Sequence, residues 1–220
     1  MSTSAPHLRR GDSVLPAWVK DGGRAILAPV VRLAIALHLT PNTITVIGLG
    51  ITIVASVLVA LDWLLLGAAI LTAGSLLDAV DGALARAQGS GTAFGGFLDS
   101  TLDRAGEAIL FIGVGTWLIR TQTDPVLPML ALMVALAGSF LVSYTHARAQ
   151  GIGLAASVGL APRTERLVLV IAGVALAGLG VTVGLIGILL VLAILTVVTV
   201  IQRIRHVWRM SVASAHSKEN

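Results

Sequence analysis

The chain has 220 residues, of which 56% are hydrophobic and only 12% are charged. This composition excludes an ordinary water-soluble domain and is typical of an integral membrane protein. Cysteine is absent, so disulfides and thiolate metal sites are excluded and any metal must be held by oxygen ligands. The formal net charge is +4, but aromatic residues make up only 4% and the basic residues adjoin apolar runs. We therefore assign the basic charge to a membrane surface and not to nucleic acid.

The first twelve residues are polar and show no cleavable signal peptide, which predicts a cytoplasmic N-terminus. Residues 24–38 are apolar but are interrupted by Pro29 and Arg32. This segment is too short and too charged to cross a hydrocarbon core, which needs about 20 residues. We therefore expect an amphipathic helix in the membrane interface, within a cytoplasmic N-terminal region of residues 1–39.

Six apolar helical segments are expected to follow, at residues 40–61, 63–86, 95–120, 125–150, 163–177 and 181–208. Thr40 provides a helix N-cap and Pro41 stands at the first helical position. The predicted fold is an all-α integral membrane protein with six transmembrane helices after the interfacial helix. Residues 40–209 would form one domain and residues 210–220 a cytoplasmic tail. Small residues between 173 and 187 predict close helix packing.

The basic residues support this topology. With a cytoplasmic N-terminus and six spans, fourteen of the fifteen lysines and arginines fall on the cytoplasmic side and only Arg120 lies outside. The positive-inside rule demands this asymmetry. We therefore expect a multi-pass protein of the cytoplasmic membrane.

Four aspartates interrupt the second and third apolar segments. Asp78 and Asp81 are three residues apart, and Asp99 and Asp103 are four apart, so each pair shares one helix face. An ionised carboxylate inside a membrane costs about 2.5–3.5 kcal/mol even on a lenient insertion scale. Because the connection at residues 87–94 is short and contains glycine, it predicts an antiparallel hairpin. We therefore expect the four carboxylates to converge.

Four converging negative charges repel one another unless cations are present, and two divalent cations would neutralise them. Oxygen ligands favour Mg²⁺ or Mn²⁺. Two metals about 3.5–4 Å apart are a known arrangement for displacement at phosphorus, so the aspartates predict phosphoryl-type transfer. Gly82 and Arg86, four residues apart, add a small patch beside a guanidinium where a phosphate or nucleotide could rest.

Two other interpretations of the acids stay open. The acids could pair with basic residues such as Arg86 and Arg104 to stabilise a helix bundle, or they could line the pathway of an ion or proton transporter. Transport would leave the spacing of Gly82, Arg86 and Gly95 unexplained. Glu107, one turn beyond Asp103, either extends the acidic face into the substrate pocket or pairs with an arginine.

The acids belong to a longer pattern, Asp78-x2-Asp81-Gly82-x2-Ala85-Arg86-x8-Gly95-x3-Asp99-x3-Asp103. All eight fixed positions match the signature of the CDP-alcohol phosphotransferase family, which the chain resembles. The resemblance implies six transmembrane helices, a homodimer and an active site open to the cytoplasm. It also implies that the four aspartates bind two divalent cations, Mg²⁺ or Mn²⁺. The resemblance further implies that the CDP-linked lipid is bound by Gly82, Ala85, Arg86 and Gly95.

The resemblance also gives Asp103 the role of general base. Asp103 would deprotonate an alcohol whose oxygen attacks the lipid-bearing phosphorus and expels CMP. Bound metals would ease this deprotonation.

Outside the signature, the chain is similar to bacterial phosphatidylinositol phosphate synthases, in stretches such as Leu39-Thr40-Pro41, Glu165-Arg166-Leu167 and Gln202-Arg203. The resemblance implies that Arg166 and Arg203 contact the phosphate of the acceptor, and we add Ser143, His146 and Arg163 to this pocket. His146 stands where those synthases have lysine. Guanidinium pairs bind phosphate bidentately. We therefore expect a phosphorylated polyol as acceptor, inositol 1-phosphate before glycerol 3-phosphate, with CDP-diacylglycerol as the donor.

Overall fold

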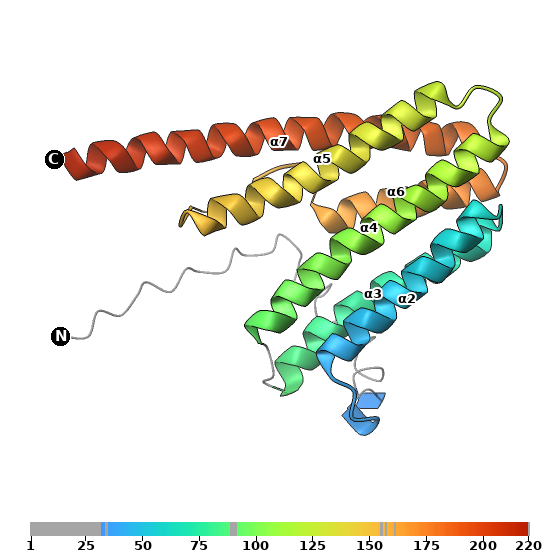
Figure 1. Cartoon of the computed structure of the whole chain (residues 1–220), viewed down its shortest axis with the longest axis horizontal. Coiled ribbons are helices and arrows are strands. Elements are labelled where there is room, and N and C mark those ends of the chain that lie inside the picture. Colours follow the sequence, from blue (N-terminus) through green and yellow to red (C-terminus); the bar gives the residue numbers. More distant parts are fainter. Residues whose placement is uncertain are drawn as a thin grey trace, which may run out of the picture.

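The computed structural model of the chain describes residues 32, 33, 35–88, 92–154, 156, 158–160 and 162–219, and it describes no side chains for residues 79–83, 85–88 and 213–219. Regular structure in this part is helical throughout. Six helices make up the bundle in Figure 1: α2 (Pro41–Ala60), α3 (Leu64–Gln88), α4 (Ala93–Thr121), α5 (Val126–Gly151), α6 (Arg163–Gly178) and α7 (Thr182–Glu219). The all-helical class predicted from the sequence is confirmed.

The helices begin where side-chain caps are available. Thr40 accepts a hydrogen bond from the backbone N–H of Thr43 at 3.2 Å, with Pro41 at the first helical position. Helix α4 begins two residues earlier than predicted, because Thr92 accepts from the N–H of Gly95 at 2.9 Å and serves as its cap. Helix α7 runs on to Glu219, through residues assigned to a tail from the sequence, and Figure 1 shows it extending past the rest of the bundle.

In the described part of the chain, three helical segments are long and apolar enough to span a membrane: Pro41–Ala60, Val126–Gly151 and Thr182–Val212. The other three helices are not among these segments. Helices α3 and α4 carry the acidic residues of the candidate site, and α6 has only 16 residues. Of the expected interfacial helix at residues 24–38, only short helical stretches at 32–33 and 35–36 lie within the described residues.

The bundle consists of two groups of three helices. Helix α2 packs on α3 and α4, helix α7 packs on α5 and α6, and the contacts α3–α6 and α4–α5 join the groups. Their shared core is aliphatic and includes the fully buried side chains of Val59, Leu118, Leu185 and Leu189. Burying such side chains is favourable against water, whereas between helices in lipid close packing is the larger contribution.

One end of the bundle is closed by tight turns and polar contacts. Asp62, with φ of 73°, turns the chain from α2 into α3. Its carboxylate accepts a hydrogen bond from the indole N–H of Trp117 at 2.6 Å, and Arg120 donates to the backbone carbonyl of Ala60 at 2.5 Å. These contacts fix the end of α4 against the α2–α3 turn, so the opposite ends of the same helices, which carry the acids, are set in register.

Helices α2 and α4 approach most closely at Gly113. A Cβ atom there would lie 2.5 Å from the backbone oxygen of Ser56, and backbone cannot move aside as a flexible side chain can. We expect Gly113→Ala to lower the free energy of unfolding by about 1–3 kcal/mol. Thermal unfolding in detergent measures this, with Gly187→Ala as the control because nothing lies within 4 Å of a Cβ at that position. Equal melting temperatures for both variants would contradict the close approach.

Candidate active site

A cavity between α2, α3, α4 and α6 brings the charged residues of the candidate site together. Its α2 wall contains Thr45 and Gly48, and α3 contributes Asp78. Helix α4 contributes Asp103 and Glu107, and α6 contributes Arg163 and Arg166. Away from these groups the lining is apolar and includes Leu71, Leu110, Phe111 and Val170. Charged side chains thus face one another across a space with an apolar base, where electrostatic interactions are stronger than in water.

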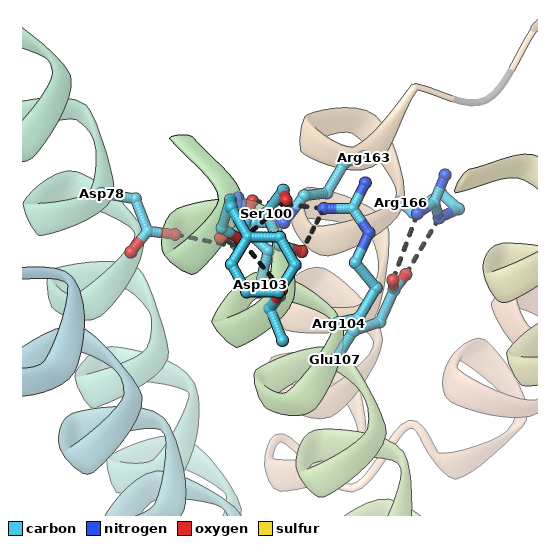
Figure 2. A network of polar contacts seen from close by, with 9 residues as sticks. Asp78, Ser100, Asp103, Arg104, Glu107, Arg163 and Arg166 are labelled. Carbon is cyan, nitrogen blue, oxygen red and sulfur yellow. Dashed lines mark hydrogen bonds and ion pairs between the residues drawn. The ribbon is translucent and has the colours of Figure 1, made fainter. Parts of the chain in front are cut away.

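Arg163 lies at the centre of this arrangement. Its Nη2 atom is 3.0 Å from Oδ2 of Asp78 and 2.8 Å from Oδ1 of Asp103. Figure 2 shows this region with Asp78 of α3, Asp103 of α4 and Arg163 labelled, so two of the four carboxylates that were expected to converge meet at one guanidinium. The sequence assigned Arg163 to the acceptor phosphate, whereas in the structure it is a cation shared by two of the predicted metal ligands.

Arg166 and Glu107 form the most buried ion pair of the cavity. The Nε and Nη2 atoms of Arg166 lie 3.0 and 3.2 Å from the two carboxylate oxygens of Glu107, a bidentate arrangement visible in Figure 2. Their side chains are 2% and 11% exposed. The open question about Glu107 is therefore answered in both senses, because Glu107 pairs with an arginine and also lines the cavity. Its partner is 59 residues away, a distance at which sequence spacing gives no signal.

The other predicted carboxylates are described only in part. Asp99 lies one helical turn before Asp103 on α4 and interacts electrostatically with Arg163 and Asp78. Arg104 Nη1 is 3.7 Å from Asp103 Oδ2 and also donates to the backbone carbonyl of Ser100 at 2.7 Å. The side chain of Asp81 is outside the described residues. Among side chains that are described, no group of three His, Cys, Asp or Glu residues is close enough to hold one metal ion.

The residues at this end of the cavity nevertheless fit a hard divalent cation. The donors are carboxylate oxygens, the ligands that Mg²⁺ and Mn²⁺ prefer. One positively charged nitrogen already contacts oxygens of both Asp78 and Asp103, so a single cation can be shared by these two helices. Gly48 of α2 also leaves room for the Asp78 carboxylate, since a Cβ at this position would lie 3.1 Å from Oδ1 of Asp78.

The predicted CDP-binding residues lie on both sides of the α3–α4 connection. Gly82, Ala85 and Arg86 are in the helical backbone of α3, but their side chains are outside the described residues. At Gly95, a Cβ would lie 3.1 Å from both the Asn42 Oδ1 and Thr92 Oγ1 atoms. Gly95 thus allows the start of α2 to approach the start of α4.

The predicted acceptor residues are not gathered around one point. Arg163 and Arg166 are engaged by carboxylates, while His146 Nδ1 lies 3.0 Å from the carbonyl oxygen of Ala156. Arg203 donates to the backbone carbonyls of Val142 and, at 2.8 Å, Val158. Arg166 and Arg203 are still close enough for their charges to interact. Ser143 is half-buried on α5, next to the carbonyl that Arg203 contacts. Of the predicted acceptor residues, Arg166 and Arg203 thus have guanidiniums whose charges repel one another.

Comparison with known proteins identifies the family of the chain. The sequence profile of the CDP-alcohol phosphatidyltransferase family matches residues 38–213. A phosphatidylinositol phosphate synthase of Corynebacterium glutamicum is 37% identical over 159 residues, which are 72% of this chain and 73% of that protein. An archaetidylinositol phosphate synthase of Methanothermobacter thermautotrophicus is 39% identical over 155 residues, 68% of this chain and 75% of that protein.

Solved structures give the same result. The crystal structure of Mycobacterium tuberculosis phosphatidylinositol phosphate synthase with CDP-DAG bound superposes with a TM-score of 0.78 at 32% identity, covering 84% of this chain and 94% of that one. A second structure of that enzyme, in complex with manganese and citrate, has a TM-score of 0.77 at 31% identity and covers 83% of this chain and 88% of that one. By its sequence profile, its relatives and its fold, the chain is an enzyme of the CDP-alcohol phosphatidyltransferase family.

Proposed function

We propose that the enzyme transfers the phosphatidyl group of CDP-diacylglycerol to a hydroxyl of inositol 1-phosphate, releasing CMP and forming phosphatidylinositol phosphate. The single observation that carries this proposal is the meeting of Asp78, Asp103, Arg163 and Arg166 in one cavity. The carboxylates suit a metal-assisted displacement at phosphorus, and the guanidiniums suit a substrate that carries a phosphate of its own. The names of the relatives support inositol phosphate as the acceptor. Ion or proton transport is not supported by membership of a transferase family.

The residues predicted from the sequence have separate roles in this proposal. Asp78, Asp81, Asp99 and Asp103 would hold two divalent cations, Mg²⁺ or Mn²⁺. Such cations supply charge stabilisation for the attacking and leaving oxygens when they are bound. Asp103 accepts the proton of the acceptor hydroxyl, since it faces the cavity and is only 13% exposed. Gly82, Ala85, Arg86 and Gly95 bind the CDP part of the lipid.

We assign the acceptor phosphate to Arg166 and Arg203, and we keep Ser143 and His146 as further proposed members of this pocket. Glu107 holds the guanidinium of Arg166 in a fixed orientation, so the cation is preorganised. A fixed guanidinium loses little conformational freedom when it binds a phosphate.

The acceptor is tested by CMP release from CDP-diacylglycerol by purified protein. Inositol 1-phosphate, glycerol 3-phosphate, serine and free inositol are compared at equal concentration with Mg²⁺ and with Mn²⁺. The highest kcat/KM is expected with inositol 1-phosphate. Preference for glycerol 3-phosphate would make the protein a phosphatidylglycerophosphate synthase, and equal rates with free inositol would exclude a phosphate pocket.

The membrane arrangement belongs to the same proposal. Residues 40–209 form the catalytic domain with six spans, flanked by cytoplasmic segments at residues 1–39 and 210–220. The site faces the cytoplasm, and the enzyme is a homodimer in the cytoplasmic membrane. The three apolar helices and the distribution of basic residues support this topology.

Labelling of introduced cysteines tests the topology, because the chain has no cysteine of its own. Gln122 and Gln150 lie at opposite ends of the α5 region. An impermeant thiol reagent is expected to label Gln122→Cys in intact cells and Gln150→Cys only after permeabilisation. Labelling of both from the same side would reject the span assignment.

The position of Arg163 gives a prediction about metal binding. Because its guanidinium contacts both Asp78 and Asp103, it competes with a cation for the same oxygens. Arg163→Gln is therefore expected to bind Mn²⁺ several-fold more tightly than wild type in the absence of substrates, about 1 kcal/mol for a partly exposed ion pair. Titration followed by electron paramagnetic resonance measures the affinity, with Arg148→Gln as a control for charge. Weaker binding by Arg163→Gln would show that Arg163 orients the carboxylates instead.

A further inference from the structure

A second pocket lies outside the carboxylate cavity, where the chain before α6 crosses α7. It has a volume of about 650 Å³ and is open on one side. Residues 158–160 form one wall, and a single face of α7 forms the floor, which includes Val198, Ile201, Gln202, Arg205, His206 and Arg209. The proposed reaction uses none of these side chains.

The wall of this pocket is held in place by specific contacts. Arg203 Nε donates to the carbonyl of Val158 at 2.8 Å, and the N–H of Leu160 donates to Thr199 Oγ1 at 3.2 Å. Gly159, with φ of +137°, lies so close to α7 that a Cβ there would be 2.3 Å from Thr199 Cγ2. Residues 158–160 are thus anchored on α7 at both ends, and the pocket is a built feature of the fold.

The α7 face changes from apolar to cationic along its length. Val198, Gln202, Arg205 and Arg209 follow one another at helical spacing, so they form one stripe about 16 Å long. Arg205 and Arg209 are exposed, and within the described residues no acidic side chain forms an ion pair with either of them. Trp208, beside them, is 66% exposed, as is common for tryptophan at a membrane surface.

We propose that this pocket binds one anionic phospholipid of the surrounding bilayer. Its phosphate lies on Arg205 and Arg209, near His206, and its acyl chains lie along Val198 and Ile201. Both ends of the stripe are then used, since guanidiniums pair with phosphate and aliphatic side chains pack on hydrocarbon. A zwitterionic lipid would place its own ammonium group beside the two arginines as a third cation, which is unfavourable. A free phosphate would leave the apolar end of the stripe without a partner.

Native mass spectrometry of delipidated protein tests the proposal, with phosphatidylglycerol and phosphatidylcholine of identical chains as probes. Wild type is expected to bind phosphatidylglycerol about 30-fold more tightly than phosphatidylcholine, which corresponds to about 1 kcal/mol for each of the two arginines near an anionic lipid. The double variant Arg205→Gln/Arg209→Gln should lose most of this preference. It should still release CMP in detergent at the wild-type rate, because the carboxylate cavity is unchanged.

The matched control is Arg32→Gln/Arg148→Gln, which also removes two exposed positive charges and should keep the preference. Glycerol 3-phosphate at equal concentration should not displace the lipid. The proposal is wrong if wild type shows no preference for phosphatidylglycerol, if the control loses as much as the double variant, or if glycerol 3-phosphate displaces the lipid efficiently. The first of these outcomes needs no variant, so a folding defect cannot obscure it.

Discussion

Asp103→Asn is expected to lower CMP release from CDP-diacylglycerol by about 100-fold or more, the lower end of the range for general base catalysis. Asparagine has nearly the same shape but no negative charge and no basic oxygen. It therefore removes the proposed proton acceptor and weakens the proposed metal site in one step. The fold should persist, because Asp103 lies at the edge of the cavity and not in the aliphatic core.

Asp124→Asn is the matched control. Asp124 is exposed at the opposite end of α4, where its carboxylate accepts a hydrogen bond from the N–H of Val126 at 3.1 Å. This variant should keep wild-type turnover, and both variants should unfold near the wild-type temperature. CMP release by Asp103→Asn above about a tenth of the wild-type rate would reject Asp103 as the base.

Removal of Arg166 is expected to lower the free energy of unfolding by about 3–5 kcal/mol, because the Glu107 carboxylate would stay buried without its bidentate partner. Arg166→Met keeps much of the side-chain volume, so the loss reflects charge more than a cavity. Thermal unfolding in detergent measures it. The double variant Arg166→Met/Glu107→Leu should be more stable than Arg166→Met, since no buried charge is left uncompensated.

Glu107→Gln tests whether Glu107 acts by fixing the orientation of Arg166. The guanidinium of Arg166 remains, but it loses the carboxylate that fixes its direction. The KM for the phosphorylated acceptor should rise severalfold while the KM for CDP-diacylglycerol changes little. Arg148→Gln, which removes an exposed arginine on α5, should change neither constant. An equal rise in both constants would mean that Glu107 supports the whole cavity and does not act through Arg166.

Much of the fold could be predicted because the relevant signals are local. The Thr40-Pro41 cap, the apolar runs and the three- and four-residue spacing of the aspartates act within one helix. The six helices accordingly lie within a few residues of the predicted segments at most ends. The early start of α4 could also have been predicted, because Thr92 is a good N-cap residue just before the predicted start.

The partners of the arginines could not be predicted in the same way. Arg163 is 85 residues from Asp78, and Arg203 is 61 residues from Val142. Several arginines of equal charge compete for each carboxylate, and only the packing of α6 against α3 decides between them. The partners of Arg203 could not be predicted either, because they are backbone carbonyls, which every residue has.

Arg163 also has a consequence for how the chain is made. Asp78 and Asp103 are synthesised before α6, so the ribosome delivers both acids to the membrane before their arginine exists. Until α6 arrives, another cation must compensate them, or they must remain near the lipid headgroups. Apolar helices neighbour the charged ones along the chain and favour their insertion. The acidic helices α3 and α4 follow the apolar α2, and α6 lies between the apolar α5 and α7 in the sequence. The contacts of Arg163 that join α3, α4 and α6 can therefore form only after the start of α6 has been translated.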